Sequence, residues 1–102
     1  MNGLMRLENN LSAQKGLRLE QRGEGNFYKV ILHIGSTLIP ISDDIVQELR
    51  AHTTLTPDQF FPIFLNKVGY SSYLQEQIRQ VVREGGDLSA QMSAMQKFFR
   101  QE

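Results

Sequence analysis

Hydrophobic and polar positions alternate along residues 17–41, which is the pattern of β-strands with one buried face. Within this stretch, Gly35-Ser36 lies between two alternating runs, and a two-residue loop with glycine first favours a type II′ hairpin turn. Such a turn fixes which residues face each other across the two strands. The predicted pairs are Ile34–Thr37, Leu32–Ile39 and Val30–Ile41.

A second turn is predicted at Gly23-Glu24-Gly25-Asn26, as a four-residue loop that joins an earlier strand to this hairpin. The pairs that follow from this loop are Arg22–Phe27, Gln21–Tyr28, Glu20–Lys29, Leu19–Val30 and Leu17–Leu32. One face of the resulting meander is apolar and consists of Leu17, Leu19, Tyr28, Val30, Leu32, Ile34, Ile39 and Ile41. A slip of one residue would scatter this set across both faces, so the register and the apolar face support each other.

The residues after the sheet carry the start signals of four helices. Ser42 is the predicted cap of the first helix, which ends near His52. Thr56 caps the second helix, with Pro57 at the first helical position and Gln59 completing a capping box. The apolar residues of this second helix are Phe60, Phe61, Ile63, Phe64, Leu65 and Val68. A helix that is apolar nearly all round should be central, and we expect it to cover the apolar face of the sheet.

Two further helices are predicted in the last third of the chain. Ser72 with Gln75 forms a capping box for the third helix, which Gly85-Gly86 ends. Asp87 or Ser89 begins the last helix. Its apolar side chains are Leu88, Met92, Met95 and Phe99. The sequence leaves open whether this helix docks on its own core or on a second subunit.

Because the strands come first and the helices follow, the fold class predicted is α+β. We expect an N-terminal three-stranded antiparallel meander packed against three to four C-terminal helices. Residues 17–102 should form a single domain of this kind. Residues 1–16 combine leucines at helical spacing with asparagine and glycine, so a flexible arm or a short helix is expected there.

Composition narrows the classes of function. The 102 residues include 11 Lys and Arg, 11 Asp and Glu, and no cysteine. A balanced charge gives no general attraction to nucleic acid or to an anionic membrane. The lack of cysteine excludes disulfides, thiolate metal ligands and a cysteine nucleophile. No apolar run reaches the length of a transmembrane helix, and the first residues lack the apolar core of a signal peptide, so we expect a cytoplasmic protein.

The residues that could carry catalysis or bind a metal do not form a set. His33 and His52 have no carboxylate or hydroxyl neighbour at a telling spacing, so each is interpreted as a surface histidine. The acidic pair Asp43-Asp44 suits the first turn of a helix. Residues 23–25 fit a hairpin connection, whereas a phosphate-binding loop should lead into a helix. We therefore expect no cofactor, no bound metal and no enzymatic activity.

The outer face of the predicted sheet carries more apolar material than a solvated face normally does. Phe27, Ile31 and Leu38 lie there, beside His33. Either the N-terminal arm or the last helix covers this face, or the face contacts another protein or a second copy of the chain. We expect the protein to be a non-catalytic protein-binding regulator or assembly factor that acts as a homodimer, and these four residues are its candidate interface. Pro40 disfavours strand pairing at one edge, while the first strand leaves the other edge able to pair across a dimer.

The alternative hypothesis is a DNA-binding transcriptional regulator that uses a helix-turn-helix-like pair at residues 57–84. Its candidate phosphate contacts are Lys67, Arg79 and Arg83. Residues 69–84 also resemble the second helix of ribbon–helix–helix repressors. Here two extra residues separate the serines from the Ile78-Arg79 core, and no short basic strand lies correctly upstream. The acidic side chains around the two arginines weaken the positive field.

Overall fold

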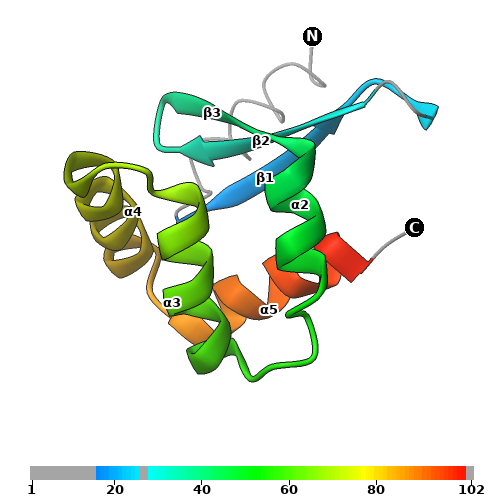
Figure 1. Ribbon diagram of the computed structural model, residues 1–102. Helices are drawn as coiled ribbons and strands as arrows, with labels where there is room; N and C mark the ends of the chain where they lie inside the picture. The colour runs from blue at the N-terminus through cyan, green and yellow to red at the C-terminus, as the bar shows by residue number, and fades with distance from the viewer. Residues whose placement is uncertain (1–15, 26–27, 101–102) are drawn as a thin grey trace, which may run out of the picture.

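The strands precede the helices, as the hydrophobic pattern predicts. The computed structural model describes residues 16–25 and 28–100, so the prediction for the N-terminal arm concerns residues that lie, except for Gly16, outside this part. The strands are β1 (Arg18–Arg22), β2 (Lys29–Ile34) and β3 (Thr37–Ile41), in the sheet order β1-β2-β3. The helices are α2 (Asp43–Arg50), α3 (Pro57–Val68), α4 (Ser72–Gly85) and α5 (Leu88–Arg100). The antiparallel sheet followed by these helices confirms the α+β fold class (Figure 1).

The hairpin between β2 and β3 has the predicted register. Its pairs include Ile34–Thr37, Leu32–Ile39 and Val30–Ile41. Gly35 has φ +60, whereas no residue other than glycine in the described ranges has a positive φ. A positive φ at the first turn residue and a negative φ at Ser36 define the type II′ geometry that the glycine favours.

The predicted register between β1 and β2 is wrong by two residues. Leu19 lies opposite Leu32 instead of Val30, and Glu20 lies opposite Ile31 instead of Lys29. The connection spans residues 23–28 and is therefore two residues longer than the predicted loop. Because side chains alternate with a period of two, this shift keeps every β1 side chain on its predicted face.

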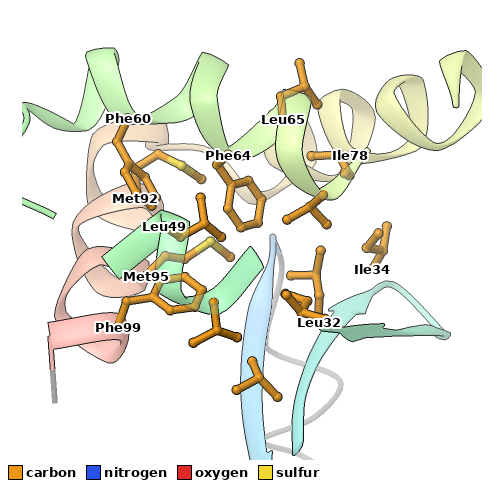
Figure 2. Close-up of a cluster of buried hydrophobic side chains, with 14 of the residues drawn as sticks. Leu32, Ile34, Leu49, Phe60, Phe64, Leu65, Ile78, Met92, Met95 and Phe99 are labelled. Atoms are coloured by element: carbon orange, nitrogen blue, oxygen red, sulfur yellow. The ribbon is translucent and has the colours of Figure 1, made fainter. Parts of the chain in front are cut away.

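The four helices of the described residues pack on the same side of the sheet and bury one continuous core (Figure 1, Figure 2). Its fully buried large side chains are Leu32, Val46, Leu49, Phe60, Phe64, Ile78, Met92 and Phe99. The closest backbone contacts with the sheet come from α2 and α4 on β2 and from α5 on β1, while α3 packs mainly against α5. Phe64 lies in the same buried cluster as Leu32, so the phenylalanine-rich helix α3 contributes to the cover of the apolar sheet face together with the other described helices.

In the structure, helix α5 packs on the core of its own chain, which is one of the two alternatives that the sequence left open. Met92, Met95 and Phe99 are buried within the common cluster. Gln96 is 3% exposed, and its Nε2 donates to the Leu55 carbonyl oxygen at 2.7 Å. A buried amide needs such a partner, since an unpaired one costs about 1–3 kcal/mol.

The helix caps follow the predicted pattern with one exception. The Ser42 hydroxyl accepts from the Ile45 N–H, and Asp87 Oδ1 accepts from the Ala90 N–H. For α4 the predicted cap is wrong by one residue, because Ser71 rather than Ser72 is the cap. The Gln75 side chain does not complete a capping box and instead donates to the Gly69 carbonyl oxygen at 2.9 Å, which closes the turn between α3 and α4.

Thr56→Ala should lower the free energy of unfolding by about 1 kcal/mol, with a range of roughly 0.5–2 kcal/mol. Both bonds of the predicted capping box are present: Thr56 Oγ1 accepts from the Gln59 N–H, and Gln59 Oε1 accepts from the Thr56 N–H, each at 3.2 Å. Urea unfolding followed by circular dichroism measures the loss. Thr54→Ala, at an exposed position outside the helix, is the control. Equal stabilities of the two variants would contradict the role of this cap.

Candidate protein-binding site

The four residues predicted as an interface differ in how much surface they offer. Leu38 is 45% exposed and lies across from His33, which is partly buried. Ile31 is only 8% exposed, although it points away from the core between Glu20 and Pro40. Phe27 lies outside the described residues. Of the described members of this set, Leu38 alone is a large hydrophobic side chain that is exposed.

His33 belongs to a polar cluster on the outer face that sequence reasoning missed. Its Nε2 lies 2.6 Å from Glu20 Oε1, and its Nδ1 lies 3.0 Å from Arg18 Nη2. A neutral ring with its proton on Nε2 satisfies both contacts, because it donates to the carboxylate and accepts from the guanidinium. The second oxygen of Glu20 accepts from Arg22 Nε at 2.8 Å. The sequence signal was the alternation of charge along Arg18, Glu20 and Arg22, which places all three side chains on one face in either register.

The hydrogen bond from Arg22, followed by that from His33, lowers the pKa of Glu20 from 4.5 to about 2. Because the pKa is lower in the folded state, the unfolded state binds more protons as the pH falls from 4.5 to 2. The stabilisation by this carboxylate should be complete above this window and lost through it. Urea unfolding of the wild type and of Glu20→Gln between pH 7 and pH 2 should show the stability difference shrinking toward the acid end. A difference that stays constant with pH would contradict the assignment.

An apolar groove of ≈ 300 Å³ runs between the edge of the sheet and helix α5. The residues that line it are Gly16, Leu17, Arg18 and Leu19 from the strand side, and Ala94, Met95 and Phe98 from α5. Leu17, Leu19 and Phe98 are only half-buried, although they pack against the core cluster. The groove therefore has an apolar floor that is open to solvent.

Strand β1 also offers backbone hydrogen-bonding groups beside this groove. A two-residue turn makes Ile34–Thr37 a hydrogen-bonded pair, and such pairs alternate along an antiparallel ladder. The even-numbered residues of β2 therefore form backbone hydrogen bonds with β3, and its odd-numbered residues form them with β1. The β1 partners of those odd-numbered residues are Arg18, Glu20 and Arg22. In the part of the chain that the structure describes, the N–H and C=O groups of Leu19 and Gln21 consequently point outward from the sheet edge.

The opposite edge, β3, is less suited to pairing. By the same alternation, Leu38 and Pro40 direct their backbone groups away from β2. Proline has no N–H, so Leu38 provides the outward donor of this strand. The sequence expectation that Pro40 disfavours pairing at this edge agrees with this geometry.

Two other hollows lie between elements. One, of ≈ 350 Å³, separates α2 from the start of β2 and the end of β3; the other, of ≈ 250 Å³, lies between α3, α4 and the start of α5. Arg79 and Arg83 line the second beside Phe61 and Leu88. Among residues 16–25 and 28–100, no group of three or more His, Asp or Glu side chains could hold a metal ion.

The residues predicted to contact DNA are paired with carboxylates. Lys67 forms an ion pair with Glu48, and Arg79 and Arg83 lie 3.4 and 3.5 Å from the two oxygens of Glu76. The helix pair α3–α4 is present, with Gly69-Tyr70-Ser71 as its connection. Tyr70 and Tyr73, at the start of α4, are 79% and 74% exposed.

No described helix combines the length and the apolar character needed to cross a bilayer. No protein-family model, curated protein or solved structure matches this chain.

Proposed function

We propose that the protein acts by binding protein chains along the β1 edge, as a non-catalytic regulator or assembly factor. One observation carries the proposal: a strand edge with outward N–H and C=O groups lies directly beside an apolar groove. An extended segment that adds to a sheet edge gains main-chain hydrogen bonds, and its alternate side chains enter the neighbouring groove. Leu19 and Gln21 would supply the hydrogen bonds here, and Phe98 would line the pocket for the side chains.

The composition is consistent with this activity in a reducing compartment. The chain has no cysteine, and its formal net charge is zero. We therefore propose a cytoplasmic protein whose contacts depend on strand pairing and apolar burial and not on a general charge attraction.

Ala94→Arg tests the proposal, because Ala94 is an exposed α5 residue at the groove and arginine is a good helix former. Ala90→Arg, exposed one turn earlier and outside the groove lining, is the matched control. Each tagged chain is incubated with extract of the native cells plus untagged wild-type chain, and the retained polypeptides are identified by mass spectrometry. The wild type and Ala90→Arg should retain at least one polypeptide that Ala94→Arg does not retain. The untagged copy of this chain counts as such a polypeptide. Identical retention by all three would overturn the proposal.

DNA binding is the second candidate, and the exposed Tyr70 and Tyr73 at the start of α4 favour it. Tyr73 and Arg79 both lie on α4, six residues or nearly two turns apart, and Tyr70 lies just before the helix, so aromatic and arginine side chains of this segment could contact a duplex. Binding of a mixed-sequence duplex at low salt, with a steep loss of affinity as the salt concentration rises, would support it. No binding at low salt would remove this candidate.

A further inference from the structure

We propose that the occupant of the β1 edge is a second copy of this chain, and that the two β1 strands pair antiparallel about a two-fold axis at Leu19. The two sheets would then form one continuous sheet, with three strands from each copy. This inference rests on the proposed function and names its partner.

Strand geometry limits how two β1 strands can pair. Opposite residues in an antiparallel pair both direct their backbone groups toward each other or both away. At an identical edge, this rule requires the two-fold axis to pass through a residue and not between two residues. An axis at Arg18 or Arg22 would place an arginine opposite its own copy, so Leu19, Glu20 and Gln21 of the five-residue strand remain as centres. These registers differ in which charges they bring together on the outer face.

The charges of β1 exclude the register centred on Glu20. That register places Glu20 opposite its own copy and Arg18 opposite Arg22, and like charges that face each other directly across strands are destabilising. The register centred on Leu19 instead places Arg18 opposite Glu20 at two symmetric positions. The alternating charges of β1 therefore oppose pairing in the register centred on Glu20 and favour pairing in the register centred on Leu19.

The apolar groove selects Leu19 over Gln21 as the centre. With the axis at Gln21, Leu19 would face Gly23. Gly23 lies beyond the end of the strand, and its φ of +91 is not that of an extended strand. With the axis at Leu19, the two Leu19 side chains meet between the two grooves, next to Phe98 and Ala94 of each copy. Leu17 then faces Gln21 of the second copy. The Leu17 N–H already donates to Gln91 Oε1 at 3.1 Å, and its carbonyl can accept from the Gln21 N–H of the second copy.

Sedimentation equilibrium of the purified chain tests the contact. The wild type and Ala90→Arg should form dimers, and Ala94→Arg should raise the dissociation constant at least about tenfold, since a charged side chain would have to be desolvated in the groove. Equal circular dichroism spectra, and equal melting temperatures at a concentration low enough for all three proteins to be monomeric, show that the effect lies in the interface. A wild type that is monomeric at its highest soluble concentration, or an Ala94→Arg dimer of unchanged affinity, would overturn the inference.

Charge exchange tests the register. Glu20→Arg brings cations together at both symmetric positions, and Arg18→Glu brings carboxylates together, so each variant alone should dimerise roughly tenfold more weakly. A mixture of the two restores opposite charges at both positions and should form heterodimers of nearly wild-type affinity. In the register centred on Gln21, the mixture would still oppose two cations, and its affinity would not recover. Failure of the mixture to recover would therefore overturn the Leu19 register.

The two proposals fail in different ways. A monomeric wild type that still captures another polypeptide, lost on Ala94→Arg, would overturn the second copy as occupant and leave the binding function supported. If the wild type is monomeric and every polypeptide that it captures is also captured by Ala94→Arg, both proposals are overturned.

Discussion

Phe64→Ala is expected to lower the free energy of unfolding by about 3–5 kcal/mol, the largest effect of any single substitution considered for this protein. Phe64 is 0% exposed and lies at the centre of the buried cluster, between helix α3 and the side chains that face it from the sheet and from the other helices (Figure 2). Its ring centroid is 6.0 Å from that of Phe60, so its removal also ends an aromatic contact. A rigidly packed core refills such a cavity only in part.

Thermal and urea unfolding measure this loss. A small domain typically has a total stability of about 5–15 kcal/mol, so the variant should melt roughly 15–30 °C lower or be largely unfolded at room temperature. Tyr73→Ala is the matched control, because Tyr73 is an aromatic residue on a helix with 74% of its surface exposed. Its stability should change by no more than about 0.5 kcal/mol. If the two variants lost similar amounts, the placement of Phe64 at the centre of the core would be wrong.

Gly85→Ala should destabilise the protein by about 1–3 kcal/mol, although helix propensity alone predicts a gain of about 1 kcal/mol. Gly85 is the last residue of α4, and a Cβ atom there would lie 2.6 Å from the Gly16 Cα and 2.8 Å from the Gly16 nitrogen. Both atoms belong to the backbone that leads into β1, so relief of the overlap requires the strand start and the helix end to separate. Gln91 links the same two segments, because its side chain accepts a hydrogen bond from the Leu17 N–H and donates one to the Val82 carbonyl oxygen at 2.9 Å.

The sign of the change in the free energy of unfolding distinguishes the predicted overlap from the effect of helix propensity. Urea unfolding of Gly85→Ala is compared with that of Gln80→Ala, an exposed position of the same helix that should stay within about 0.5 kcal/mol of the wild type. A more stable Gly85→Ala protein would mean that local propensity governs the site and that β1 does not approach the end of α4 as closely as described.

The β2–β3 hairpin could be predicted from the sequence because its loop is too short to permit a choice. Two residues with glycine first allow one turn type and therefore one register. The β1–β2 connection is longer, and lengthening a flexible loop by two residues costs only a few tenths of a kcal/mol. Sequence pattern defines the faces of β1 but cannot distinguish registers that differ by two residues, so Leu19 was placed opposite Val30 and not opposite Leu32.

The groove could not be predicted because it depends on which helix lies beside β1. The pattern of α5 assigned Met92, Met95 and Phe99 to a buried stripe, and the structure buries all three. Nothing in that pattern shows which strand the stripe meets. Phe98 gave a local signal: it cannot share the inner face of the helix with Phe99, so one large apolar side chain had to lie at the margin of the core.

Burial also changes how the outer face is interpreted. Ile31 counted toward an apolar docking surface in the sequence, yet its exposed fraction is 8%, and the adjacent His33 is held by Arg18 and Glu20. Pairing along the β1 edge would not require the outer face to be uncovered. The contact would use backbone groups and the groove on the inner side. The charges of Arg18, Glu20 and Arg22 would exclude the register centred on Glu20, and the groove would select Leu19 as the centre.

Residue-resolved hydrogen exchange of the purified chain, at low and high protein concentration, tests the β1 contact most directly. The account predicts that the amides of Leu19 and Gln21 exchange more slowly as the concentration rises, while the amide of Leu38 on the opposite edge does not change. Exchange of the two β1 amides that is independent of concentration, or new protection at Leu38 instead, would contradict it.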